Sequence, residues 1–313
     1  MSDCNLPMSK NNKYSKNAII VSGLPRTATT ALGDILSSIN GYNMIYEPFN
    51  ASQGILSVEK NYLIPGANTD NSNFDDIFDS IINLNAKFKL GIKKDDSVIK
   101  KTIKTLFGNE SSLSLLKSKF FTNQKKLIVK DPFLVFASLH LSKNYKIVMC
   151  ERPILPLAGS FKRMGWEFPE YDRLVKDFES MGIRDIEKIE NNSISLPVLG
   201  AIQFCQLYSI FKHRIDGKEN IYFFNQDNFS INPEDSIKKL FNWLDEKCTD
   251  KILKKVQRLN SGDTLIPKKD VQHDLSYKKS LSNKYYKSIL TDEEISFIDS
   301  VAEERFELPT RGL

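Results

Sequence analysis

The sequence predicts an α/β protein with a central parallel β-sheet, and two observations support that prediction. Short apolar runs recur along the chain, and each is followed by a turn and a helical pattern, which is how parallel α/β sheets are built. The runs are continuously apolar rather than alternating, which is typical of strands buried on both faces. They cover residues 17–22, 126–130, 145–150 and 220–224.

The predicted helices have apolar residues at a spacing of three and four. They cover residues 28–39, 133–141, 155–164 and 196–214; one begins near Pro233, and one covers 293–306 after a capping box. Further helical patterns at 74–85, 97–107 and 113–121 lie between the first two strand signals. We therefore expect residues 51–125 to form a helical insertion that covers a substrate site.

Composition excludes several classes of protein. The chain has 313 residues, 41% of them hydrophobic, which is too apolar for a disordered chain. The net charge of +5 is compatible with an anionic ligand, but the excess of Lys is spread along the chain without interleaved aromatic residues, so we expect no nucleic-acid partner. No apolar run is long enough for a membrane span or a secretory signal, and four scattered cysteines indicate no metal site. We expect a cytoplasmic protein.

The loop after the first predicted strand has the composition of an anion site. Residues 22–30 read Ser-Gly-Leu-Pro-Arg-Thr-Ala-Thr-Thr and lead into a predicted helix. Backbone N–H groups and the positive end of the helix dipole suit a phosphate or sulfate there, and Arg26 adds a cation. An ordinary helix start with spare threonines is the alternative. A nucleoside-triphosphate loop would need Gly at 28 and Lys at 29, where Ala and Thr stand, so kinase chemistry is disfavoured.

This loop resembles the 5′-phosphosulfate loop of sulfotransferases that use 3′-phosphoadenosine 5′-phosphosulfate (PAPS), a family that usually has Gly at the position of Ala28. The family's second hallmark is a strand followed by Arg, with Ser eight residues later, and Arg152 and Ser160 have that spacing. Arg163 matches the family's Ser-x-x-Arg ending, whereas Pro153 stands where the family has Asp. The resemblance extends in separated blocks over about residues 17–245.

The resemblance implies a three-layer fold like that of P-loop NTPases. We expect one such α/β domain at 17–313, after a disordered leader at 1–16 and with a loop-rich segment at 260–290. It implies PAPS as co-substrate, no metal, and a hydroxyl-bearing small molecule, glycan or lipid as acceptor. The residues expected to bind PAPS are Gly23, Pro25, Arg26, Thr27, Ala28, Thr29, Thr30, Arg152, Ser160 and Arg163.

Sulfonyl transfer needs cations near the transferred group and a base for the acceptor hydroxyl. We expect Arg26 and Lys130 to supply the positive charge. Glu47, on or just after a strand that returns to the sheet edge, is the preferred base, as in carbohydrate- and tyrosine-type members of the family, and His140 is the alternative. Two other functions remain open: a nucleotide or nucleoside-phosphate kinase of related fold, and a catalytically silent PAPS-binding protein.

Overall fold

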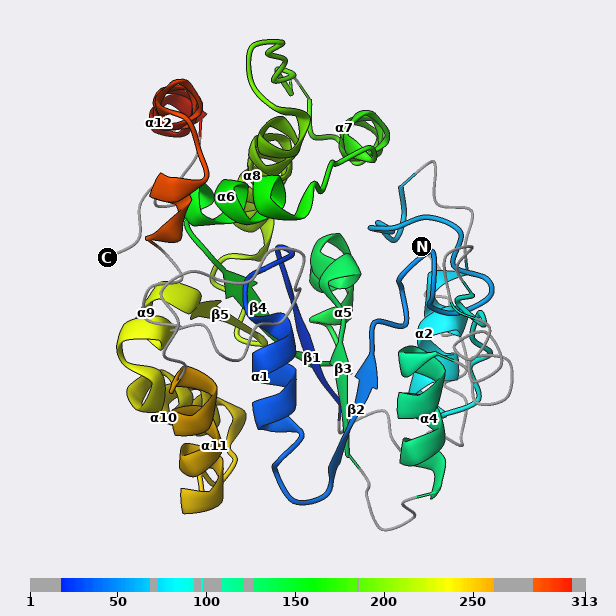
Figure 1. The fold of residues 1–313 in the computed structure, drawn as a ribbon. Helices are drawn as coiled ribbons and strands as arrows, with labels where there is room; N and C mark the ends of the chain where they lie inside the picture. The colour runs from blue at the N-terminus through cyan, green and yellow to red at the C-terminus, as the bar shows by residue number, and fades with distance from the viewer. Residues whose placement is uncertain are drawn as a thin grey trace.

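The computed structural model describes residues 18–67, 73–92, 97, 109–120, 126–184, 186–261 and 284–305. Its centre is a five-stranded sheet in which every pairing is parallel, in the order β2-β3-β1-β4-β5 (Figure 1). The strands are β1 (Ala18–Gly23), β2 (Tyr42–Tyr46), β3 (Lys126–Lys130), β4 (Lys146–Glu151) and β5 (Ile221–Asn225). The predicted fold class is therefore confirmed, and each predicted strand lies within one residue of its expected place.

Apolar residues cover both faces of the sheet, which explains why the strands are continuously apolar. On one face Ile19 and Val21 of β1 pack with α1 (Thr29–Leu36), α10 (Pro233–Leu244) and α11 (Asp250–Asn260). On the other face Ile20 belongs to a larger core. That core includes residues of the 3₁₀ helix η1 (Pro132–Ala137), α5 (Ser138–Leu141), α6 (Ile154–Met164) and α8 (Leu196–Ile215). Helices on two faces of one sheet give the three layers that we expected.

The remaining elements surround this centre. α2 (Phe74–Ile82) and α4 (Glu110–Phe120) are the helices described between β2 and β3, and α4 packs against β2. α7 (Tyr171–Ser180) lies with α6, α8 and α12 (Asp292–Arg305) at one end of the sheet, in the upper part of Figure 1. α9 (Gln226–Ile231) follows β5, and η3 (Tyr285–Ser288) packs against α6. None of the helices in these described ranges is long and apolar enough to cross a membrane.

Several elements differ from the prediction. The helix expected at 133–141 is split into η1 and α5, because the Asp131 side chain caps a turn at Phe133 and Pro132 occupies the first position. The helix α9 between β5 and α10 was not predicted; it begins where the Asn225 side chain accepts a hydrogen bond from Asn228 N. α1 ends at Leu36 rather than at residue 39. The leader, the 97–107 pattern beyond Ser97 and residues 262–283 lie outside the described residues.

Candidate active site

All five strands deliver residues to one cavity of about 550 Å³. Each of these residues ends a strand or follows its carboxyl end, and ligands of open parallel sheets bind at that edge. The contributing residues are Arg26 after β1, Glu47 after β2, Lys130 at the end of β3, Arg152 after β4 and Gln226 after β5. The sheet topology therefore brings together residues that lie far apart in the sequence.

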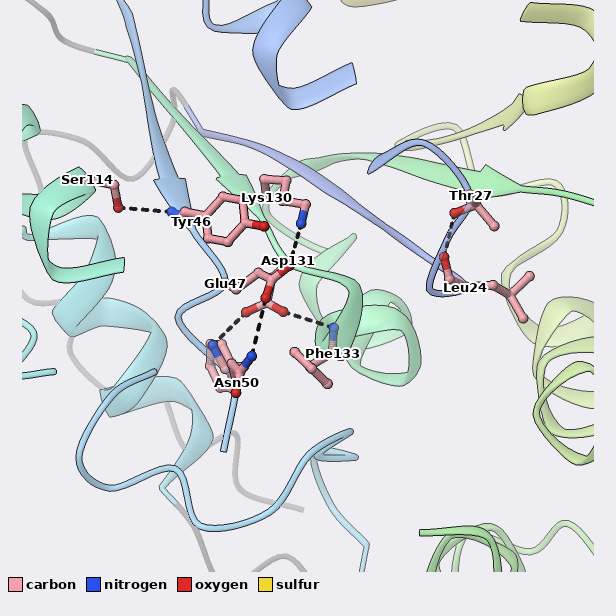
Figure 2. Close-up of polar contacts among 10 residues, drawn as sticks. Leu24, Thr27, Tyr46, Glu47, Asn50, Ser114, Lys130, Asp131 and Phe133 are labelled. Carbon is pink, nitrogen blue, oxygen red and sulfur yellow. Dashed lines mark hydrogen bonds and ion pairs between the residues drawn. The ribbon is translucent and has the colours of Figure 1, made fainter. Parts of the chain in front are cut away.

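Most residues that we predicted for the site line this cavity. They are Pro25, Arg26, Ala28, Thr29, Thr30, Glu47, Lys130, Arg152, Ser160 and Arg163. Gly23 and Thr27 do not line it, and both support the loop instead. Gly23 has a φ of 136°, and a Cβ there would overlap the Cys150 carbonyl. The buried Thr27 hydroxyl donates to the Leu24 carbonyl oxygen at 2.5 Å (Figure 2).

The backbone of the loop after β1 has the shape of an anion site. Arg26 and Ala28 have φ values of 67° and 66°, whereas Thr27 between them does not have a positive φ. Left-handed residues alternating with ordinary ones turn successive N–H groups toward one point, which creates a concave anion site. Ala28 is also the residue before α1, and its side chain makes no capping hydrogen bond. The first backbone N–H groups of α1 therefore find no hydrogen-bond acceptor in the side chain of the residue that precedes the helix.

Three arginines face the same cavity as this loop, and two of them are joined through it. Arg26 Nε donates to Ser160 Oγ at 3.0 Å, and Arg152 Nη1 donates to the Arg26 carbonyl oxygen at 3.2 Å. Arg152 and Ser160 are buried, and Arg163 follows Ser160 by one turn of α6. The two sequence signals, 126 residues apart, thus meet in direct contact.

The charges of these arginines act on one another. Burial, and then the nearby Arg152 and Arg163, lower the pKa of Arg26 to about 10, which still leaves the guanidinium charged at neutral pH. Aromatic rings pack on two of the cations: Arg26 Cζ lies 5.7 Å from the centre of the Trp166 ring, and Arg152 Cζ lies 5.8 Å from that of Tyr285. An anion bound between the arginines would relieve their mutual repulsion.

Glu47 and Lys130 form an ion pair on another wall of the cavity. Lys130 Nζ lies 2.5 Å from Glu47 Oε1, although the Lys130 side chain is only 2% exposed (Figure 2). The ammonium also lies 4.3 Å from the centre of the Tyr46 ring. Asn50 Nδ2 donates to the other carboxylate oxygen of Glu47 at 3.3 Å. The carboxylate is thus held in place while its side chain stays 18% exposed.

His140, the alternative base, lies away from this cavity. Its Nε2 pairs with Asp75 Oδ1 at 2.7 Å, and its ring packs edge-on against Phe74. Phe74 and Phe78 in turn pack against the buried Phe49, so these aromatics of the 51–125 segment belong to the core. The structure therefore keeps Glu47, and not His140, among the cavity residues.

Several lining residues were missed by the sequence analysis. One aromatic group comprises Tyr62, Phe133, Trp166 and Phe168. A second group comprises Gln226, Phe229, Ser230, Leu259, Asn260 and Tyr285. Gln226 could have been found, because it follows a predicted strand. The position of Trp166 depends on how α6 packs, and no local pattern indicates it.

The sequence matches none of the known protein-family models and none of the curated protein sequences. Comparison with solved structures gives matches. The chain is similar to sulfotransferases. Mouse sulfotransferase SULT7A1, solved in complex with PAP, is 10% identical with a TM-score of 0.46, over 93% of this chain and 84% of that one. Sulfotransferase STF9 from Mycobacterium avium is 14% identical with a TM-score of 0.41, over 96% and 79%. The sulfotransferase domain of the curacin biosynthetic pathway is 15% identical with a TM-score of 0.44, over 94% and 98%.

Proposed function

We propose that the protein transfers a sulfonyl group from PAPS to a hydroxyl-bearing acceptor and releases 3′,5′-phosphoadenosine. The observation that carries the proposal is the contact network that joins Arg26, Ser160 and Arg152 around the loop after β1. A ligand with two separated anionic groups matches this arrangement. Arginine suits both groups, because its planar fork can donate two hydrogen bonds to one phosphate.

Each end of the donor would bind a different part of the site. The N–H groups of the loop and the hydroxyls of Thr29 and Thr30 would hold the 5′-phosphate at the start of α1. Arg152, Ser160 and Arg163 would hold the 3′-phosphate. Thr29 stands where a nucleoside-triphosphate loop has its Lys, which disfavours the kinase alternative.

The transfer itself would be an in-line displacement at sulfur. The acceptor oxygen forms a bond to sulfur, and the bond between sulfur and the bridging oxygen breaks, so the leaving phosphate gains negative charge. Arg26 and Lys130 would neutralise that charge, since cations placed before the reaction stabilise a transition state strongly. Glu47 would take the proton of the acceptor hydroxyl. Because Lys130 and Glu47 form an ion pair, the expected cation and the expected base lie next to each other.

The acceptor would enter beside Glu47. Tyr62, Phe133 and Phe168 line the same cavity, and the Tyr62 ring lies 5.2 Å from that of Phe133 and 5.8 Å from that of Phe168. Asn50 and Asn61 add amide groups. Apolar walls with a few polar groups are typical of sites for small organic ligands. We therefore expect a small molecule, a glycan or a lipid that carries a hydroxyl group.

A comparison of two variants tests this function. PAPS is supplied with a panel of phenols, sugars and alcohols, and release of 3′,5′-phosphoadenosine is measured. We expect Glu47→Gln to lower kcat by about 100-fold or more, the usual effect of a general base. His140→Gln is the control and should retain the activity of the unchanged protein. Binding of PAPS without turnover of any acceptor would favour a silent binding protein, and stabilisation by ATP with Mg²⁺ but not by 3′,5′-phosphoadenosine would favour a kinase.

A further inference from the structure

The backbone at Glu47 is held in a conformation that is unfavourable for its sequence. Glu47 has a φ of 42°, in the left-handed region that L-residues other than Gly rarely adopt. Pro48 follows directly and further restricts the backbone of the residue before it. Strained residues persist only where surrounding contacts fix them, and they are frequent at functional sites. The contacts that fix Glu47 are therefore relevant to how its carboxylate is presented.

Asp131 provides one of these contacts from a fully buried position. Phe133 N donates to Asp131 Oδ1 at 2.9 Å (Figure 2). Phe49 N donates to Asp131 Oδ2 at 2.6 Å. The backbone N–H of Asp131 donates to the Val21 carbonyl oxygen of β1 at 2.9 Å. The side chain is 0% exposed. Through its backbone and its carboxyl group together, Asp131 thus joins the end of the sheet, the segment after β2 and the start of η1.

Lys130 holds the other end of the same segment. Glu47 N donates to the Lys130 carbonyl oxygen at 2.8 Å, and Lys130 Nζ pairs with the Glu47 carboxylate. Pro48 has no N–H to donate, so the backbone donors of residues 47–49 are those of Glu47 and Phe49. Both of them donate to the Lys130-Asp131 pair. The strained residue is therefore held on both sides by two consecutive residues of one strand end.

We propose that Asp131 is a positioning residue for Glu47, and that its carboxyl group fixes the strained backbone from which Glu47 acts as base. The inference rests on the proposed function of Glu47. Asp131 does not line the cavity and does not contact the arginines, so its effect falls on the transfer step and not on binding of the donor. Its second bond, to Phe133 N, caps η1 and places the aromatic wall of the acceptor side.

Two substitutions separate the two bonds of Asp131. In Asp131→Ser the hydroxyl can still cap η1, because Ser is a preferred N-cap, but it is too short to accept from Phe49 N as well. In Asp131→Asn the amide can accept only one of the two bonds. We expect both variants to bind 3′,5′-phosphoadenosine within about twofold of the unchanged protein by calorimetry, and to lose about tenfold or more in kcat with PAPS. The control is Glu294→Gln, a buried carboxylate paired with Lys162 outside the cavity, which should keep kcat.

A double-mutant cycle distinguishes positioning from a general structural effect. If Asp131 acts through Glu47, Glu47→Gln combined with Asp131→Ser should be no slower than Glu47→Gln alone, because coupled residues are not additive. Full additivity, or unchanged kcat in both single variants, would overturn the inference. The proposed function fails in a different way: the Glu47→Gln variant would then keep full activity, or the unchanged protein would not bind 3′,5′-phosphoadenosine.

Discussion

Arg26 Nε donates to Ser160 Oγ at 3.0 Å, although 134 residues separate the two in the sequence. This hydrogen bond ties the loop after β1 to α6, and it orients a charged guanidinium through a side chain that is only 1% exposed. Arg26 makes no ion pair among the residues that the structure describes, so its charge is available to an anionic ligand. The relationship between these two residues leads to the first prediction.

Ser160→Ala removes the hydroxyl that accepts a hydrogen bond from the Arg26 guanidinium. It should weaken binding of 3′,5′-phosphoadenosine by about 10-fold or more, because a hydrogen bond to a charged group contributes roughly 1.5–3 kcal/mol. Titration calorimetry measures the change. Ser138→Ala is a matched control, since that buried hydroxyl donates to the Val135 carbonyl oxygen outside the cavity. Equal weakening in the two variants would mean that the effect is a loss of packing.

Ala28→Gly should raise the free energy of unfolding by about 1 kcal/mol, because the φ of 66° at Ala28 is costly for a residue with a Cβ. Gly23→Ala should do the opposite and destabilise the protein, since the new Cβ would overlap the Cys150 carbonyl. Urea unfolding of the two variants gives both signs. A destabilised Ala28→Gly variant would contradict the backbone conformation that we describe.

Lys130→Met should lower kcat by about 10-fold or more, because it removes a cation from the site and leaves the Glu47 carboxylate without its cationic partner. The methionine side chain is apolar and close to Lys in length, so it suits the buried position beside the Tyr46 ring. Affinity for 3′,5′-phosphoadenosine should change little, since that product has no sulfonyl group. A variant with a normal kcat would show that Lys130 serves only to hold the fold.

The stability of the protein should depend on pH through Asp131. Burial, and then the nearby Glu47, raise the pKa of its carboxyl group to about 8, against about 3.9 in an unfolded chain. The folded state therefore binds this proton more tightly, and its stability falls as pH rises from about 4 to about 8, by at most about 1.4 kcal/mol per pH unit.

Asp131→Asn lacks this carboxyl group. As pH rises from about 4 to about 8, the free energy of unfolding of the unchanged protein should therefore fall relative to that of the variant. Above about pH 8 the difference between the two should be constant. Urea unfolding at pH 5, 7 and 9 measures the difference. A difference that is the same at all three values would show that the carboxyl group has an ordinary pKa in the folded state.

The parts of the site that follow local rules could be predicted from the sequence. Arg26 and Arg152 each follow an apolar strand, and Ser160 lies on the helix after the second of these strands, so strand order alone brings them to one edge. Asp131 could not be assigned a role, because its contact with Phe49 depends on β2 and β3 being neighbours in the sheet. The η1 turn was missed because the residues after Pro132 have the apolar spacing of an ordinary helix. The Asp131 cap and Pro132 favour a 3₁₀ turn there instead.

The packing of the Trp166 and Tyr285 rings against two arginines of the site could not be predicted either. Both lie beside arginines that come from other elements, and no pattern in their own segments predicts these contacts. Their positions follow from the packing of α6 against η3, which is a tertiary contact. The roles of Glu47, Lys130 and Ser160 in binding and catalysis remain predictions, which the variants above test.

The most direct test of the central claim is calorimetric titration of 3′,5′-phosphoadenosine into the unchanged protein and Arg152→Ala. We expect the unchanged protein to bind and Arg152→Ala to bind at least about 10-fold more weakly, because buried charged hydrogen bonds are lost. Arg214→Ala removes the same charge from an exposed position on α8 and should bind normally. Absence of binding by the unchanged protein, or equal affinity in the unchanged protein and Arg152→Ala, would contradict the account.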